Sequence, residues 1–376
     1  MARRKRGAVV VAGQMPPPVG GQNLNVQRVY QLLRKEEEGP VRHWRFNFTK
    51  DSANFSSVGL DKVLELVRVV GRLLRLRLEG AIDVIIYPVG GPHLAPVLRD
   101  ALLLPWAYLF SRRVFLHFRA AGLKEYLESC PRWLAQVARS IYQRADRAIV
   151  LSQFGSRDAE AAGLKDCFVM PNGLEDTLGE GSGQSLRSSS ETRTIALSVG
   201  HLCHEKGTPE LLRAFGQIQG DYPDLELHLV GEPARDLTHT DLENLRAECS
   251  DPDRVKFRGL LKGEALAEAY RNAHLFVFST VAPYESFGMV AIEAMHWSLP
   301  IVATDWRANR EVCGEGEGVV FAEGVEEDLT GGLTTALLKA LAAKEQWPQW
   351  GRANRKRYED LYSIEKLRVR LRELLA

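Results

Sequence analysis

Short runs of apolar, β-branched residues alternate with longer amphipathic stretches along most of the chain. The apolar runs have the length and composition of buried strands, and the amphipathic stretches have the 3.6-residue period of helices. This alternation predicts parallel sheets that are covered by helices on both faces. The predicted strands lie at residues 8–12, 41–46, 83–87, 114–118, 148–152 and 168–170, and then at 194–199, 225–230, 255–257, 275–278 and 301–304.

A stretch without apolar periodicity, residues 178–192, separates the two groups of strands and is rich in Gly, Ser and Glu. That composition is typical of a linker or a surface loop. A chain of 376 residues is also too long for one ordinary hydrophobic core. We therefore predict two α/β domains, residues 1–176 and 177–355, with a linker over 177–193 and a final helix within 356–376.

Residues 60–79 form a strongly amphipathic stretch in the first half. One face carries Leu60, Val63, Leu64, Val67, Val70, Leu74 and Leu78, and the other carries Asp61, Glu65, Arg68, Arg72, Arg75 and Glu79. The pattern predicts a surface helix of the domain, and it also fits a basic amphipathic helix that lies on a membrane. Residues 102–106 and the pair Arg112-Arg113 would then add an aromatic anchor, although the same segment also fits a buried core.

The net charge of +1 conceals an asymmetry between the two halves. Residues 1–175 contain 26 Lys and Arg against 16 Asp and Glu, a charge of +10, and the rest contain 23 against 32, a charge of −9. A basic half indicates an anionic partner, such as anionic lipid, a phosphorylated acceptor or nucleic acid, or an attraction between the two halves. The first half has no groove-reading or base-stacking motif, so we expect no nucleic-acid partner.

The cysteines and the longest apolar run bear on location. The five cysteines are scattered and include no C-x-x-C pair, which indicates a reducing compartment. The longest apolar run covers residues 101–110, whereas a membrane-spanning helix needs about twenty residues. We therefore expect a cytoplasmic protein, with peripheral contact with the inner face of an anionic membrane through the basic half.

The segment with the most chemical information covers residues 283–295. Glu285 and Glu293 are eight residues apart, and Gly288 lies between them, where a loop would turn into a helix. The N–H groups and partial positive charge of a helix N-terminus bind phosphate, and nearby carboxylates accept hydrogen bonds from sugar hydroxyls. A strand follows at residues 300–304, which is the order expected for a nucleotide site in a Rossmann-like domain.

This segment resembles the E-x7-E motif of the retaining glycosyltransferases of family 4, also described as glycosyl transferases group 1. Those enzymes have the GT-B fold, in which two Rossmann-like parallel-sheet domains face each other across a cleft. The resemblance implies that Glu285 contacts the donor sugar and that Glu293 holds the ribose of the nucleotide. It also implies backbone N–H contacts to the sugar and phosphate from Phe287, Gly288 and Met289.

Two glycine-containing loops resemble motifs of the same family. Residues 198–207 are similar to its G-R-L-x-x-x-K-G loop, which makes Lys206 the cation that neutralises the donor diphosphate. His201 stands where the family usually has Arg, and an imidazole lacks the fixed charge and bidentate fork of a guanidinium. Residues 14–22 are similar to the loop after the first strand, in which Gly20 and Gly21 would let the backbone approach the donor phosphates.

Single positions in other family-like segments complete the candidate site. His117, at the end of a predicted strand, matches a family histidine that points toward the sugar, although a lone His after an apolar strand is more often structural. Residues 255–260 resemble the family strand whose following loop meets the nucleotide base, which implies that Leu260 contacts the base. The last helical stretch, residues 358–375, would cross back to the first domain.

Together the motifs imply a retaining, hexosyltransferase-like glycosyltransferase that moves a sugar from a UDP-sugar or GDP-sugar to an acceptor hydroxyl. Catalytic roles fall to His117, Glu285 and Lys206, and the donor is a substrate, so we expect no cofactor. Analogy favours polysaccharide or glycolipid biosynthesis. His201, and Glu175 in place of a family Asp, keep open a second interpretation: a non-catalytic nucleotide-sugar-binding or partner subunit with the same fold.

No essential metal is expected. His201, Cys203 and His204 lie close together in the sequence, but no second group of ligands accompanies them. Residues 251–253 form a D-x-D string that precedes a predicted strand, and we interpret it as a loop of turn residues.

Overall fold

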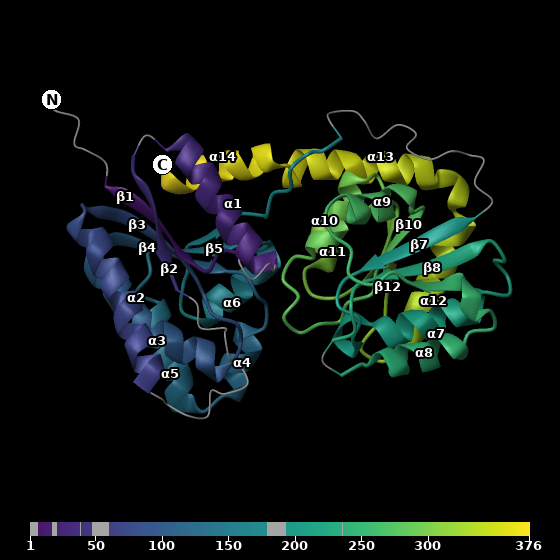
Figure 1. Ribbon diagram of the computed structural model, residues 1–376, viewed down its shortest axis with the longest axis horizontal. Helices are drawn as coiled ribbons and strands as arrows, with labels where there is room; N and C mark the ends of the chain where they lie inside the picture. Colours follow the sequence, from purple (N-terminus) through teal and green to yellow (C-terminus); the bar gives the residue numbers. More distant parts are fainter. Residues whose placement is uncertain (1–6, 17–20, 38, 47–59, 179–192, 235) are drawn as a thin grey trace. The chain divides into compact units, whose positions relative to one another are not determined.

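The computed structural model describes residues 7–16, 21–37, 39–46, 60–178, 193–234 and 236–376. The chain forms two compact units (Figure 1), the first comprising Met1–Asn172 and Arg368–Ala376 and the second Gly173–Leu367. The change of unit after Asn172 lies four residues before the predicted boundary. The last nine residues return to the first unit, and each unit is described below by itself.

The first unit is built on a six-stranded parallel sheet with the order β2-β1-β3-β4-β5-β6. Its strands are β1 (Ala8–Gly13), β2 (Val41–Arg45), β3 (Ile82–Pro88), β4 (Ser111–Phe118), β5 (Arg147–Val150) and β6 (Cys167–Val169). The inner strands are apolar along nearly their whole length because helices cover both faces of the sheet.

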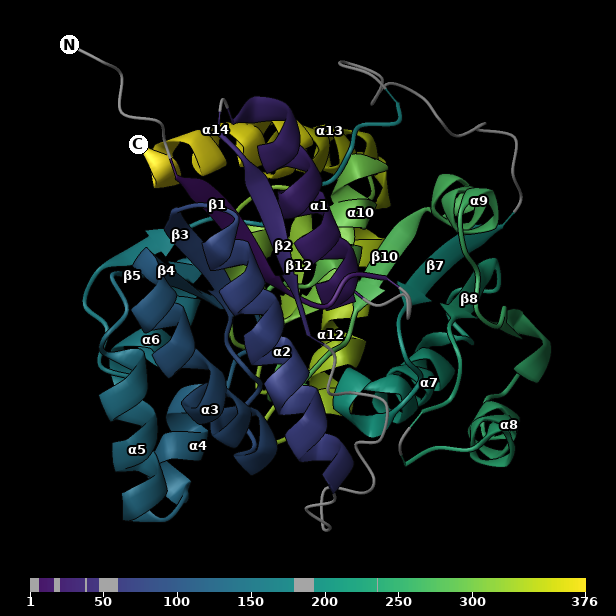
Figure 2. The same ribbon diagram turned by 60° about the vertical axis from the view of Figure 1, so that its left-hand side comes forward.

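The helices of the first unit lie on two faces of its sheet. They are α1 (Gly21–Glu36), α2 (Leu60–Leu78), α3 (Leu94–Phe110), α4 (Leu123–Ser129), α5 (Arg132–Tyr142), the short η2 (Gln153–Gly155) and α6 (Ser156–Ala161). Connections between parallel strands are right-handed, so the direction in which the chain moves across the sheet decides which face a helix covers. The chain moves toward one edge through α1 and toward the opposite edge through α2, α3 and α5. Helix α1 therefore covers one face, and the other three helices cover the opposite face. Figures 1 and 2 show α2, α3 and α5 as one layer, with α1 beside the end of α14 (Ile364–Leu375).

The second unit repeats this architecture with the strand order β12-β11-β10-β7-β8-β9, again all parallel. Its strands are β7 (Thr194–Val199), β8 (Leu225–Val230), β9 (Val255–Phe257), β10 (Leu275–Phe278), β11 (Ile301–Thr304) and β12 (Val319–Ala322). The first five have the predicted bounds, and β12 was missed because this half-buried edge strand follows a Gly- and Glu-rich stretch. Two such sheets confirm the predicted α/β class.

The helices of the second unit complete its layers. They are η3 (His204–Lys206), α7 (Thr208–Ile218), α8 (His239–Ala247), η4 (Pro252–Arg254), α9 (Glu264–Asn272), α10 (Met289–His296), α11 (Asn309–Cys313), α12 (Leu329–Ala342), η5 (Lys344–Gln346), α13 (Trp347–Arg357) and the π-helix η6 (Tyr358–Tyr362). Helix α14 follows and ends in the first unit.

Helix α2 begins at the predicted residue and ends one residue before the predicted end, but it does not have the predicted core face. Val69 and Leu73 are fully buried, whereas most described residues of the stripe expected to face inward are exposed. The exposed members are Leu64, Val67, Leu74 and Leu78. Leu and Val also occur at 66, 69, 73 and 76, so the helix carries two apolar stripes, and periodicity alone could not tell which one packs on the sheet.

The beginning of the linker is fixed to the second unit by a buried arginine. Arg355 forms an ion pair with Asp176 and donates from Nη1 to Nδ1 of His296, at 2.9 Å. Because a guanidinium only donates, that nitrogen accepts, and Nε2 of His296 donates to Oγ1 of Thr177 at 3.0 Å. Burial and the charge of Arg355 lower the pKa of His296 to about 4, so this contact is made by a neutral ring. The network holds the C-terminal end of α10 in place.

Candidate functional site

Most of the predicted site residues lie at the carboxyl edge of the second sheet. The chain leaves β7 toward β8 and β9, and then returns to the other side of β7 to form β10, β11 and β12. The order therefore reverses between β7 and β10, and the loops that follow these two neighbouring strands carry Lys206 and Glu285. Open parallel α/β sheets bind ligands outside such a switch point.

Lys206 and Glu285 are in direct contact. The Lys206 Nζ lies 2.5 Å from Oε2 of Glu285, and both side chains are largely but not fully buried. Oε1 of the same carboxylate accepts a hydrogen bond from the backbone N–H of Gly288, at 3.1 Å. The pair is thus held together at the beginning of α10, where the partial positive charge of the helix favours an anionic group.

A glycine lets these two loops approach each other closely. Gly207, which ends η3, has a φ of +67°, and a Cβ there would lie 2.2 Å from the carbonyl oxygen of Ser279. Ser279 Oγ in turn donates to the carbonyl oxygen of Lys206, at 2.8 Å. This hydrogen bond from a side chain to the main chain joins the two loops and orients Lys206 independently of its ion pair.

Glu293 lies one turn into α10 and is oriented by a residue from another helix. The buried hydroxyl of Tyr270, on α9, donates to Oε2 of Glu293 at 2.8 Å. Burial and the charge of Glu293 raise the pKa of Tyr270 well above its usual range, so the phenol stays protonated and remains a donor. Tyr270 was not predicted, because in the sequence it reads as one more apolar position of an amphipathic helix.

The remaining predicted contacts in this unit lie around the same edge. His201 is exposed just after β7, and Leu260 is 58% exposed in the loop after β9. Phe287 is buried, with its ring edge-on to Tyr362 at 5.6 Å, so only its backbone is available for the predicted contact. Met289 is the first residue of α10, where main-chain N–H groups have no partner within the helix.

His117 belongs to the first unit, at the end of β4, and is almost completely buried. The guanidinium Nη2 of Arg119 lies 3.2 Å from its Nδ1, which must therefore accept, and the ring proton must be on Nε2. Burial, followed by the charge of Arg119, lowers the pKa of His117 well below its usual range, so the ring is neutral. Within the described part of the chain, Nε2 has no hydrogen-bond partner. This orphaned donor fits a contact with a ligand, and it weakens the structural interpretation of His117.

The neighbouring strand of the first unit carries a second polar atom of this kind. Ser152 lies two residues after the end of β5, is buried, and its hydroxyl has no hydrogen-bond partner among the described residues. Of the first glycine loop, Gly21 begins α1, while Gly20 lies outside the described residues.

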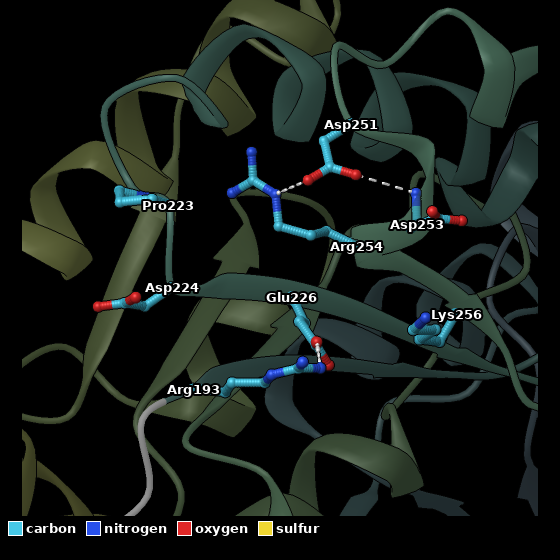
Figure 3. A pocket seen from close by; sticks show the side chains of 8 residues that line it. All are labelled: Arg193, Pro223, Asp224, Glu226, Asp251, Asp253, Arg254 and Lys256. Atoms are coloured by element: carbon cyan, nitrogen blue, oxygen red, sulfur yellow. Dashed lines mark hydrogen bonds and ion pairs between the residues drawn. The ribbon is translucent and has the colours of Figure 1, made fainter.

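No group of three or more His, Cys, Asp and Glu that could hold a metal ion occurs in the parts of the chain that the structure describes. The D-x-D string lines a hollow of about 410 Å³ at the amino ends of β7, β8 and β9, the opposite edge of the sheet (Figure 3). There Asp251 accepts hydrogen bonds from the backbone of Asp253, at 3.2 Å, and from Arg254, at 3.0 Å. Asp251 thus caps η4, as expected of a loop of turn residues.

The two Rossmann-like sheets define the GT-B fold class, and solved structures confirm it. Sucrose-phosphate synthase from Thermosynechococcus elongatus superposes with a TM-score of 0.75 at 19% identity, covering 98% of both chains. HepE from Anabaena, in complex with UDP-glucose, gives a TM-score of 0.70 at 16% identity, covering 98% of this chain and 99% of that one. At such identities the likeness concerns the fold.

The match to a family model lies within the second unit. Residues 186–357 match the family model described as glycosyl transferases group 1. Mannosylfructose-phosphate synthase from Agrobacterium fabrum is 32% identical over 139 residues, which is 36% of this chain and 30% of that protein. Phosphatidyl-myo-inositol mannosyltransferase from Mycobacterium leprae is 28% identical over 228 residues, or 59% and 58% of the two proteins. The chain thus matches less than two thirds of the length of these relatives, and it is similar to GT-B glycosyltransferases.

Proposed function

We propose that this chain is a retaining, metal-independent glycosyltransferase that moves a sugar from a nucleoside-diphosphate sugar to an acceptor hydroxyl. The observation that carries the proposal is the contact of Lys206 with Glu285 at the beginning of α10, with Glu293 one turn further on. A cation, a helix N-terminus and two carboxylates at one switch point suit a donor that combines diphosphate, ribose and hexose. We also propose that the chain belongs to glycosyltransferase family 4.

Each residue has a defined role in the proposed reaction. Lys206 and the first N–H groups of α10 stabilise the charge that develops on the leaving diphosphate. Glu285 accepts hydrogen bonds from the transferred sugar, and Glu293 accepts them from the ribose hydroxyls. The neutral His117 donates its Nε2–H to a sugar hydroxyl. The donor is a UDP-sugar or a GDP-sugar, and the acceptor belongs to polysaccharide or glycolipid biosynthesis on the cytoplasmic side of a membrane.

Nucleotide binding provides the test of this proposal. Thermal denaturation is followed with UDP, GDP and their hexose derivatives, with a chelator and with Mg²⁺. One nucleotide at a hundredfold excess over its Kd should stabilise the protein by about 2.7 kcal/mol, without requiring metal. Glu293→Ala should abolish the shift, whereas Glu268→Ala, which removes an exposed carboxylate from the neighbouring α9, should keep it. The absence of a shift with every nucleotide would refute the proposal.

The second candidate function is a non-catalytic nucleotide-sugar-binding or partner subunit. It is favoured by His201, which stands where the family usually has Arg. Release of nucleoside diphosphate from the sugar nucleotide that binds distinguishes the two. Turnover that is lost in His117→Ala supports the enzyme, whereas tight binding without donor hydrolysis or transfer supports the partner subunit.

Removing the hydroxyl of Tyr270 should weaken nucleotide binding without abolishing it. In Tyr270→Phe the buried ring and its packing on Phe276 remain, but Glu293 loses the donor that orients it. A hydrogen bond to a charged group is worth about 1.5–3 kcal/mol, so we expect a Kd about ten- to a hundredfold higher. Calorimetric titration with the preferred nucleotide measures it. An unchanged Kd would show that the Tyr270 hydroxyl does not position Glu293 for the ligand.

A further inference from the structure

The outward side of α2, α3 and α5 in the first unit is unusually apolar. Helix α3 packs against both α2 and α5, so the three helices form one continuous layer over the sheet (Figure 2). We refer to the outward side of this layer as the α2–α3–α5 face. Several large apolar side chains of these three helices are exposed to solvent on this face.

Helix α3 carries the longest exposed apolar stripe. Its exposed members are Leu94, Leu98, Leu102, Trp106 and Leu109, which recur at helical spacing and run the whole length of the helix. The only charged residues of α3 are Arg99 and Asp100, which bind each other, and Asp100 is fully buried. A helix of 17 residues is about 25 Å long, so the stripe is long as well as uncharged.

Helices α2 and α5 extend the apolar surface on either side. Val67 and Leu78 of α2 are 62% and 79% exposed, and Trp133 of α5 is 60% exposed. Leu64 and Leu74 lie on the same stripe as the first two. An apolar surface that covers three helices exceeds what isolated surface residues produce and marks an interaction site.

The charges beside this surface have one predominant sign. From Leu64 to Leu78, α2 contains four exposed arginines, Arg68, Arg72, Arg75 and Arg77, and one acidic residue, Glu65. Helical spacing places the first three beside the exposed stripe. Their contacts with Glu65 and Glu79 are exposed ion pairs, which are weak and exchange readily for another anion.

A cationic hollow lies where the stripe of α3 ends. It has a volume of about 430 Å³ and is lined by Pro105, Tyr108, Leu109, Arg112 and Arg144, among others. Asp146 also lines it and accepts a hydrogen bond from the backbone of Val114, so the two arginines leave the lining with an excess of one positive charge. Arg112 lies 3.3 Å from Asp83 and keeps most of its side chain exposed. A phosphate between the two guanidiniums would be neutralised while Leu109 beside it enters an apolar phase.

We propose that the α2–α3–α5 face docks on an anionic phospholipid bilayer, with lipid phosphates at Arg112 and Arg144. Exposed leucines and tryptophans enter the acyl boundary, and the arginines of α2 remain at the headgroups, as in interfacial helices. Tryptophan favours this boundary because its ring is both apolar and a hydrogen-bond donor. The purpose of such docking, access to a membrane-linked acceptor, rests on the proposed function. The test of the docking does not depend on that function. No described helix is long and apolar enough to cross the bilayer.

Vesicle flotation of the whole chain, without nucleotide, tests the docking. The protein should float with phosphatidylglycerol-containing vesicles at low salt and hardly with phosphatidylcholine alone. Leu74→Ser/Leu78→Ser/Leu109→Ser should reduce partitioning by about tenfold or more at any salt concentration. Arg68→Gln/Arg72→Gln/Arg75→Gln should reduce it at low salt and flatten its salt dependence.

Matched controls come from α14, which lies beside α1 and away from this face (Figure 1). Val369→Ser and Arg370→Gln change exposed residues of the same unit and should float like the unchanged chain. All variants should keep their thermal midpoints and their response to nucleotide, which separates this test from that of the proposed function. The proposal is overturned if the unchanged chain fails to float with anionic vesicles, or if the face variants float normally. Sedimentation velocity that shows a dimer dissociated by the leucine changes, with flotation unaffected, would also overturn it in favour of self-association.

Discussion

Replacing Lys206 by Met should reduce the turnover of the sugar nucleotide by about a hundred- to a thousandfold, the loss typical of one group that stabilises developing charge. Met preserves most of the apolar stem, so the loop should keep its shape through the hydrogen bond from Ser279 and the turn at Gly207. The carboxylate of Glu285 would then lose its cation and keep only weaker dipolar partners. Both effects act on the leaving diphosphate, and kcat should fall more than KM rises.

The measurement is the steady-state release of nucleoside diphosphate, together with the Kd of the product nucleotide. Lys206→Arg restores the charge with a longer, planar head group and should recover part of kcat but not all of it. Lys339→Met removes an exposed lysine from α12 of the same unit and should stay within about twofold of the unchanged chain, as surface substitutions usually do. A loss of less than about threefold in Lys206→Met would remove Lys206 from the proposed mechanism.

The strands show what the sequence determines well. Parallel strands that are buried on both faces read as continuous apolar runs, and for this reason residues 225–230 and 275–278 were predicted with their observed bounds. The edge strand β12 was missed because half of its surface faces away from the core. Helix α2 was found, but its orientation was not, because two apolar stripes on one helix are equivalent until the rest of the layer is in place.

The residues of the candidate site also differ in how far the sequence could predict them. Lys206 and Glu285 come from loops that follow neighbouring strands, so the order of the sheet alone brings them together. Tyr270 acts through one hydroxyl and is the one buried residue of its amphipathic helix, so nothing in its spacing distinguishes it from a core position. His117 was found by its match to a family histidine at the end of a strand, whereas its orphaned Nε2 depends on the orientation of Arg119 and could not be predicted.

Gly288→Ala should be among the most destabilising single substitutions in the second unit. The residue caps α10 with a φ of +70°, in the left-handed region, which costs a residue with a Cβ roughly 1–2 kcal/mol. The new Cβ would also lie 2.6 Å from Cζ of Phe278, a buried ring at the end of β10. Overpacking of this kind adds roughly 1–3 kcal/mol. The backbone N–H that holds Glu285 is displaced by the same change, so nucleotide binding should be lost together with stability.

Calorimetric unfolding measures the stability of Gly288→Ala, with Gly220→Ala as the control. The control shows the effect of adding a methyl group at a glycine where it meets no other atom. A Cβ at Gly220 meets no atom within 4 Å, so the control should unfold like the unchanged chain. Combining Gly288→Ala with Phe278→Leu removes the ring that the new methyl group strikes. If the clash dominates, the double variant should be more stable than the sum of the single effects predicts, with a coupling energy of roughly 1 kcal/mol or more. Strict additivity would assign the loss to the left-handed backbone alone, and an unchanged unfolding temperature in Gly288→Ala would contradict the geometry of this turn.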